Sequence, residues 1–280
     1  MNASSPRMHT KPIPSSGEPL GVIGLGTYVG FDVRQGSGGT ARLQEVLHKL
    51  LEPGGSVIDS SPMYGNAEAV TGGLLAASGA RARTFLATKV WTRGEQAGMA
   101  QMNRSMELLR TDRLDLMQVH NLLDWRVHLK TMRGWKEAGR IRHIGVTHYT
   151  SSAYAELEAV LRAEPLDFVQ LNYSVMDRAA EQRLLPLALE RRVAVLANLP
   201  LASGSALRAV ASRPLPGVAG ELACTSWAQL LLKFVISHPA VACAIPGTSR
   251  PEHMADNAAA GIGPLADDAQ RERIARAYQA

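Results

Sequence analysis

Four residues suited to proton transfer follow or interrupt short apolar runs in the first half of this 280-residue chain. Asp59 ends the run SVID, Lys89 interrupts TFLATKV, and His120 ends LDLMQVH. Tyr64 follows Asp59 by five positions, after Ser-Ser-Pro-Met. A carboxylate, an amine, an imidazole and a phenol around one reacting oxygen would suit general acid chemistry.

Lys89 is the most informative of the four, because a buried ammonium without a partner is costly. Asp59 is its natural partner. Intervals of 30 and 31 residues separate Asp59, Lys89 and His120, which matches one strand–helix unit each. Each residue has a plainer explanation as a capping turn, a structural ion pair or a core histidine. Their convergence on one mouth of a barrel favours a catalytic site.

The sequence alternates between short apolar runs and segments with helical periodicity, and this alternation predicts the elements that would position these residues. Near-continuous apolarity is typical of strands covered on both faces, and helical periodicity fills the intervals. We expect eight strands, at 21–26, 56–59, 84–90, 114–120, 141–149, 167–173, 193–200 and 241–247. Eight strand–helix pairs without a charge-rich linker predict an α/β fold with one domain over residues 1–280, a (β/α)8 TIM barrel.

Three additions to the barrel are expected. The N-terminal arm, residues 1–18, would form a β-hairpin that caps the floor of the barrel. The segment 265–280 would form an extra C-terminal helix. The interval 201–223, rich in Ser, Gly, Ala and Pro, would be a loop over the mouth.

Composition limits the classes of function. The 30 basic and 25 acidic residues are interspersed and give a net charge of +5, without the basic block of a nucleic-acid groove. The two cysteines, Cys224 and Cys243, lack metal-ligand spacing and are expected to be reduced core thiols. No run reaches the length of a membrane span, so we expect a soluble, cytoplasmic protein.

An ordered set of motifs resembles the aldo-keto reductase family, in a bacterial form with short loops, over nearly the whole chain. The motifs are GLGT (24–27), D-x4-Y-G (59–65), Lys89, QVH (118–120), GR-x3-IGV (139–146), QLNYS (170–174) and IPGTSRPEHMADN (245–257). The resemblance implies NADPH-dependent reduction of aldehydes or ketones to alcohols, with the catalytic residues at Asp59, Tyr64, Lys89 and His120.

In this interpretation Tyr64 delivers the proton and a nicotinamide delivers the hydride. A phenol has a reference pKa of about 10, and the Lys89 ammonium is expected to lower that value. Asp59 would keep the lysine charged and oriented, while His120 would hydrogen-bond the substrate carbonyl.

The resemblance also implies a site for NADPH, with NADH less favoured because Arg250 and His253 would address a 2′-phosphate. Two positions depart from the family pattern: His148 replaces an asparagine, and Asn198 replaces an aromatic residue, so cofactor affinity could be weaker. The expected cofactor-binding residues are Gly26, Thr27, Asp59, Thr147, His148, Gln170, Asn172, Asn198, Leu199, Pro200, Leu201, Gly204, Ile245, Gly247, Thr248, Ser249, Arg250, His253, Asp256 and Asn257.

The substrate pocket would be lined by Tyr28, Trp91, Asn121 and Trp125, which follow the first, third and fourth strands. Aromatic walls suit small carbonyl compounds, and we expect an open cleft with loose selectivity. No metal, nucleic acid or membrane is expected as a partner, and the chain would be a monomer or a small homo-oligomer.

Three other interpretations remain open on the sequence alone. GLGTYVG could begin a dinucleotide-binding Rossmann fold, although its third glycine is misplaced. Lys89 could form a Schiff base in a barrel lyase. The chain could also be a nucleotide-binding regulatory or sensor protein with little turnover.

Overall fold

The computed structural model describes residues 7–34 and 38–280, and its main feature is an eight-stranded parallel sheet in which the strands follow their sequence order. Isolated bridges between Ile23 and Ala244 and between Gly26 and Gly247 join the first and last strands. The predicted (β/α)8 barrel is therefore confirmed. The strands are β3 (Leu25–Gly26), β4 (Val57–Asp59), β5 (Phe85–Val90), β6 (Leu114–His120), β7 (Ile141–His148), β8 (Phe168–Asn172), β9 (Ala194–Asn198) and β10 (Val241–Ala244).

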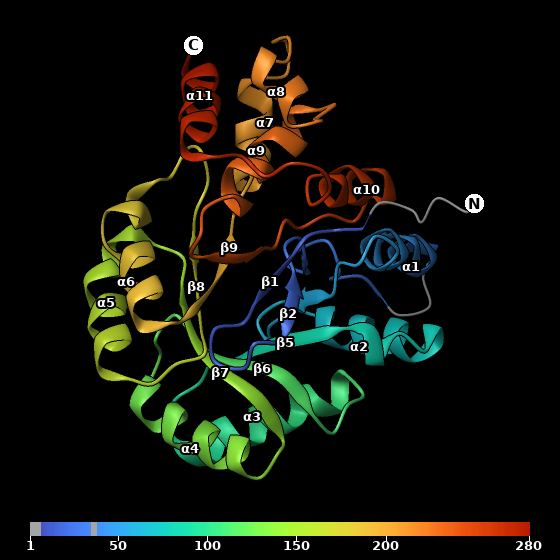
Figure 1. The fold of residues 1–280 in the computed structure, drawn as a ribbon. Coiled ribbons are helices and arrows are strands. Elements are labelled where there is room, and N and C mark those ends of the chain that lie inside the picture. The colour runs from blue at the N-terminus through green and yellow to red at the C-terminus, as the bar shows by residue number, and fades with distance from the viewer. Residues whose placement is uncertain (1–6, 35–37) are drawn as a thin grey trace.

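Helices surround the strands (Figure 1). In α1 the buried side chains Leu43, Val46, Leu47 and Leu50 recur at helical spacing, so one stripe packs inward. The helices are α1 (Gly38–Leu51), α2 (Ala67–Ser78), α3 (Glu95–Leu108), α4 (Trp125–Glu137), α5 (Tyr154–Ala163), α6 (Leu184–Arg191), α7 (Ser205–Ala209), α8 (Gly217–Glu221), α9 (Trp227–Ile236), α10 (Pro251–Ala259) and α11 (Asp268–Gln279). Short 3₁₀ turns lie at η1 (Arg81–Arg83), η2 (Ser151–Ala153), η3 (Ala179–Gln182) and η4 (Ala202–Gly204).

Side chains alternate between the inside of the barrel and the helical shell. On β6, Leu116 belongs to the interior cluster, whereas Met117 and Val119 pack with the helices. Successive side chains of a strand point to opposite faces, so Gln118 and His120 share the inward face with Leu116. This alternation places polar side chains above an apolar plug inside the barrel.

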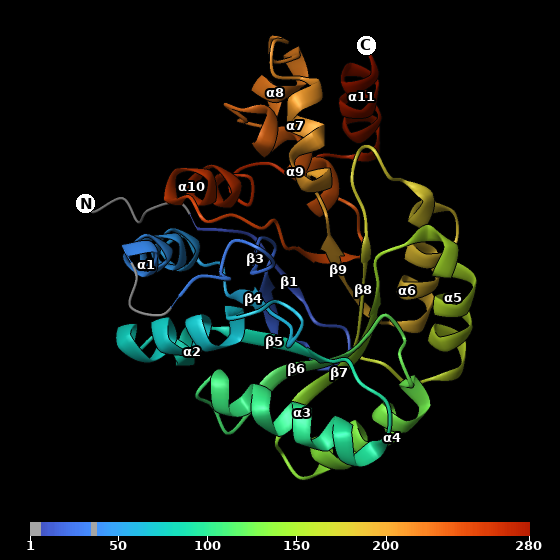
Figure 2. The same cartoon turned by 180° about the vertical axis from the view of Figure 1, so that it is seen from behind.

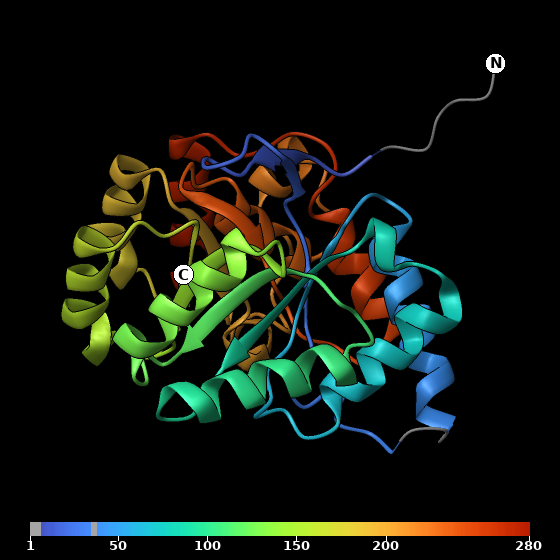
Figure 3. The same cartoon turned by 90° about the horizontal axis from the view of Figure 1, so that it is seen from below.

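The N-terminal hairpin supplies part of that plug. Strands β1 (Thr10–Pro12) and β2 (Pro19–Gly21) pair antiparallel, and Ile13 and Leu20 are buried in the barrel interior. Figure 3 shows the hairpin at the end of the barrel where the strands begin. The predicted floor cap is confirmed. It extends past residue 18 to Gly21, so the first barrel strand is shorter than the expected 21–26.

The C-terminal additions differ in how well the sequence predicted them. Helix α11 is present as expected, and its Arg271 donates to the Phe234 carbonyl at 3.2 Å and to the Tyr173 hydroxyl. The interval 201–223 is not a bare loop but contains η4, α7 and α8, which lie beside α9 and α11 (Figure 2). The indole of Trp227 donates to the Arg213 carbonyl at 3.0 Å, which binds this segment to α9.

None of the helices in the described part of the chain combines the length and the apolarity needed to cross a membrane.

Candidate active site

A buried ion pair lies at the centre of the barrel. Lys89 of β5 is fully buried, and its Nζ donates to Asp59 Oδ2 at 2.5 Å and to the Ser60 carbonyl at 2.7 Å. Asp59 ends β4, the strand next to β5, and is 2% exposed. Neighbouring parallel strands that both point a side chain inward bring the two charges together, as the sequence predicted.

Tyr64 is held over this pair by a tight turn. Its amide donates to the Ser61 carbonyl at 3.0 Å, and Gly65 follows with φ +57°. Asp32 Oδ1 accepts from the backbone amide of Asn66 at 2.9 Å and from the Asn66 side chain at 3.0 Å, which fixes the turn. The Lys89 ammonium consequently lies 5.2 Å from the centre of the Tyr64 ring.

His120 completes the group from β6. Its ring meets the Tyr64 ring edge-on with centroids 6.1 Å apart, and its Nδ1 lies 3.1 Å from the Ser61 hydroxyl. Burial, with the nearby positive charge of Lys89, lowers the pKa of His120 to about 3. The imidazole is therefore neutral at physiological pH and can donate one hydrogen bond.

The ionisation of the lysine and the tyrosine reflects burial as well as charge. Burial acts to lower the pKa of Lys89, but the charge of Asp59 opposes it and the pKa is raised. Burial raises the pKa of Tyr64, while the charge of Lys89 acts to lower it. The expected net lowering of the Tyr64 pKa is thus not found, because loss of hydration outweighs the attraction to Lys89.

Two buried glutamines contact Asp59 from further around the barrel. Gln118 Nε2 and Gln170 Nε2 each donate to Asp59 Oδ1 at 3.0 Å. Gln118 was not among the expected site residues, although it stands two positions before His120 and so shares its face of β6. Gln170 was expected to hold the nicotinamide, but its amide nitrogen is directed to Asp59 in this structure.

Ser60 and Ser61 also escaped the sequence prediction, since a Ser-Ser pair after a strand is common in turns. Thr27, which was expected to bind the cofactor, donates its hydroxyl to the Asp59 carbonyl at 3.1 Å and to the Ser60 hydroxyl at 3.0 Å. These contacts tie the loop after β3 to the end of β4.

The ends of β7, β8 and β9 carry further polar groups around the mouth. Thr147 donates to Gln170 Oε1 at 3.4 Å. Asn172 and Asn198 are partners in the β8–β9 register, and the Oδ1 atom of each is buried without a hydrogen-bond partner among the described residues. His148 lies on the other face of β7, where its Nδ1 accepts from the Thr150 amide at 3.2 Å and its ring stacks on Tyr149.

The loop before α10 holds the expected phosphate-binding residues at the surface. Arg250 and His253 are exposed, and Arg250 Nε donates to Glu252 at 2.6 Å. Thr248 Oγ1 accepts from the Arg250 amide at 3.1 Å. Ser249 is half-buried beside them. The guanidinium nitrogens Nη1 and Nη2 of Arg250 make no hydrogen bond within the described chain.

Two other residues expected in the cofactor site lie within α10. Asp256 accepts from Ser226 at 2.8 Å and from Gln229 at 2.6 Å, which links α10 to α9. Asn257 is 4% exposed within α10. The remaining expected residues line the seam of the barrel or the loop after β9: Gly26, Ile245 and Gly247 at the seam, and Leu199, Pro200, Leu201 and Gly204 in the loop.

The rim of the mouth is apolar and exposed. Tyr28 is 65% exposed and its ring lies 5.0 Å from that of Tyr64, and Trp91 at the end of β5 is 40% exposed. Asn121 follows β6 with φ +54° and a buried Oδ1 that lacks a partner in the described chain. Trp125 is 8% exposed and packs in the core cluster at the start of α4.

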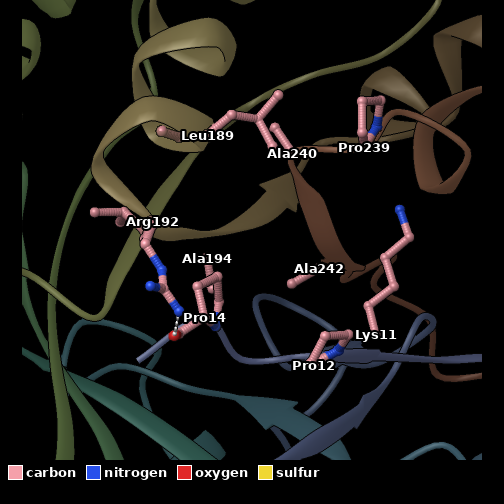
Figure 4. A pocket seen from close by; sticks show the side chains of 11 residues that line it. Lys11, Pro12, Pro14, Leu189, Arg192, Ala194, Pro239, Ala240 and Ala242 are labelled. Carbon is pink, nitrogen blue, oxygen red and sulfur yellow. Dashed lines mark hydrogen bonds between the residues drawn. The ribbon is translucent and has the colours of Figure 1, made fainter. Parts of the chain in front are cut away.

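A separate cavity of about 220 Å³ lies beside the floor hairpin (Figure 4), and its lining includes none of the polar residues around Asp59. Lys11 borders it, but its Nζ already donates to the carbonyls of Ile236, His238 and Val241. Arg192 donates to the Pro14 carbonyl at 3.3 Å. The ammonium of Lys11 is therefore bonded within the protein, and the polar group around Asp59 and Tyr64 lies at the opposite end of the barrel.

No cluster of His, Cys, Asp or Glu arranged to hold a metal occurs in residues 7–34 and 38–280. Both cysteines are buried, and burial raises the pKa of the Cys243 thiol.

A buried Asp–Lys pair, a phenol and a neutral imidazole thus lie together at the mouth of the barrel. The model of the aldo/keto reductase family matches residues 22–278, and the chain belongs to this family. Methylglyoxal reductase YeaE of Escherichia coli (strain K12) is 33% identical over 265 residues, which cover 90% of this chain and 89% of the relative.

Solved structures agree. An aldo-keto reductase from Klebsiella pneumoniae in complex with NADPH superposes with a TM-score of 0.79 at 26% identity, covering 98% of this chain and 96% of the other. A second aldo/keto reductase from the same organism, in complex with NADP and acetate, gives a TM-score of 0.77 at 28% identity, covering 94% and 93%.

Proposed function

We propose that this protein reduces small aldehydes or ketones to alcohols with NADPH, and that Tyr64 is the proton donor. The observation that carries the proposal is the position of the Lys89 ammonium between the carboxylate of Asp59 and the ring of Tyr64, with His120 facing the same ring. A carbonyl oxygen beside Tyr64 and His120 would meet two donors of hydrogen bonds.

The residues of the mouth fit a dinucleotide. The buried Oδ1 atoms of Asn172 and Asn198 lack a hydrogen-bond donor among the described residues. The carboxamide group of a nicotinamide carries two N–H donors. The exposed Arg250 and His253, at the start of α10, suit a phosphate. Both Klebsiella structures hold NADPH or NADP, which supports the same cofactor here. When bound, NADPH supplies hydride to the carbonyl carbon.

The protein groups supply the rest of the chemistry. The raised pKa of Tyr64 keeps the phenol protonated at neutral pH, so the proton is present when the substrate arrives. Lys89 then stabilises the phenolate that forms as the proton leaves. His120, neutral because its pKa is lowered to about 3, donates to the substrate oxygen through Nε2 and fixes its position.

Oxidation of NADPH, followed by its absorbance, tests the proposal. Methylglyoxal is the first substrate to try because the E. coli relative is named for it, followed by a series of aldehydes and ketones. Tyr64→Phe should lower kcat by roughly 10²–10⁴ and leave the affinity for NADPH within about twofold.

Tyr278→Phe, which changes a tyrosine of α11 far along the chain, is the matched control and should retain wild-type rates. Full activity of Tyr64→Phe would remove the phenol from the mechanism. Tight NADPH binding without reduction of any carbonyl would favour a regulatory protein instead.

A further inference from the structure

The carboxylate of Asp59 is held from two sides. Lys89 occupies Oδ2, while the amide nitrogens of Gln118 and Gln170 occupy Oδ1, each at 3.0 Å. Gln170 Nε2 also lies 3.4 Å from Gln118 Oε1, so the two amides contact each other. The arrangement fixes the rotation of the carboxylate and leaves Oδ2 for the lysine.

The strand register explains why Gln118 reaches this position. Lys89 of β5 and Gln118 of β6 are direct partners across the sheet, and both point inward. On its other side Gln118 is paired with Gly145 of β7, which carries no side chain. Gln118 is fully buried, and a buried amide that lost its partner would be costly.

We infer that Gln118 is a positioning residue for the reaction: its amide orients and screens the Asp59 carboxylate, so that Lys89 directs its charge toward Tyr64. The inference deepens the proposed function and rests on it. In this role Gln118 acts through its hydrogen bond to Asp59, and thereby through Lys89.

The electrostatic consequence has a definite sign. Asp59 acts to raise the pKa of Tyr64, and Lys89 acts to lower it. An N–H group directed at the carboxylate reduces the negative potential that reaches the phenol. Loss of the Gln118 amide should therefore raise the pKa of Tyr64 further and weaken it as an acid.

Other ionisable groups also face the phenol, and they stay in place in a Gln118 variant. Tyr64 is faced by Asp59 from β4, Lys89 from β5, His120 from β6 and Tyr28 from the loop after β3. Asp32 lies beneath its turn.

The test is a titration that does not depend on turnover. The ultraviolet absorbance of tyrosinate is followed against pH, and the difference between wild type and Tyr64→Phe isolates Tyr64. The same difference is measured in the Gln118→Met background, where the side chain keeps its length but has no N–H. The pKa of Tyr64 should rise by about half a unit to one unit.

Kinetics provide the second readout. Gln118→Met should lower kcat roughly three- to tenfold, with NADPH affinity within about twofold of wild type, because the defect lies in proton transfer. Met117→Leu is the matched control. It changes a fully buried side chain of the same strand on the opposite face and should alter neither the titration nor kcat.

If Gln118→Met does not fold, Gln118→Leu takes its place, since it is similar in size and also lacks the N–H donor. It should raise the pKa of Tyr64 relative to wild type. An unchanged Tyr64 titration in the folded variant overturns the inference. A shifted titration in a protein that reduces no carbonyl would instead refute the proposed function and leave the positioning role intact.

Discussion

Lys89 and Asp59 form a demanding contact, since both charges are withdrawn from water. Removing one partner of a buried pair leaves the other uncompensated, whereas removing both is tolerated much better. Single and double substitutions of this pair should therefore differ in their effect on the free energy of unfolding.

Lys89→Met should lower the free energy of unfolding by about 3–5 kcal/mol, because Asp59 would remain as a buried, unpaired carboxylate. The double variant Lys89→Met with Asp59→Leu should recover at least half of that loss. Urea unfolding measures both values. Lys49→Met removes an exposed pair with Glu52 at 3.9 Å and should cost less than about 1 kcal/mol.

The lowered pKa of His120 predicts how the free energy of unfolding depends on pH. Its pKa is lowered from 6.5 to about 3, so between these values the unfolded chain binds a proton that the folded protein does not. The folded state therefore loses stability as the pH falls from 6.5 toward 3. His120→Asn should flatten the slope of the unfolding free energy against pH in this window.

A residual slope should persist in His120→Asn, because the pKa of His238 is also lowered, to about 4, by burial. An identical slope in wild type and variant would show that His120 is not buried in its neutral form.

At the scale of elements, the turn that carries Tyr64 depends on one glycine. Gly65 has φ +57°, and a Cβ there would stand 2.4 Å from Asp32 Cγ. An alanine would both strain the backbone and displace the carboxylate that accepts from Asn66. The position of the phenol is thus set by the loop after β3 as well as by its own turn.

Gly65→Ala should lower kcat about tenfold or more and reduce stability by roughly 1–2 kcal/mol, as measured by steady-state assay and urea unfolding. Gly79→Ala provides the comparison. Gly79 has φ +62° at the end of α2, but a Cβ added there would meet no atom within 4 Å. The Gly79→Ala variant should therefore be destabilised only by backbone strain. Equal losses of kcat in the two variants would argue against a role for the turn.

At the scale of the whole molecule, an apolar floor lies at the end of the barrel opposite the Asp59–Lys89 pair. The hairpin side chains Ile13 and Leu20 fill the floor, and the polar residues lie above. Leu20→Ala should lower the free energy of unfolding by about 2–5 kcal/mol and leave KM and kcat of the folded protein unchanged. Leu189→Ala, at a side chain that is 47% exposed, is the control and should change stability little.

The architecture was predictable because parallel strands and amphipathic helices leave strong, regular patterns, such as the run LDLMQVH that matches β6 residue for residue. The pairing of Asp59 with Lys89 was predictable for the same reason, since strand order and inward orientation follow from the barrel. The sequence missed α7 and α8 because short helices in a Gly- and Pro-rich interval depend on packing against α9 and α11.

The finer features of the site arise from tertiary contacts that no local pattern encodes. The net direction of the Tyr64 pKa depends on burial by surrounding segments. Trp125 followed a strand in the expected way but turned into the core with the first turn of α4. Gln118 could have been placed near the site from the sequence, because it stands two positions before His120 and so shares its face of the strand. A glutamine in a strand does not, however, indicate chemistry by itself.

The closure of the barrel through Ile23 and Ala244 has a consequence for synthesis of the chain. These partners are 221 residues apart, so a ribosome must deliver β10 before the ring can close. The Asp59, Lys89 and His120 strands emerge earlier and can associate as an open, curved sheet with its first edge unpaired. A nascent chain halted before β10 should therefore expose that edge to chaperones, and synthesis through β10 should bury it.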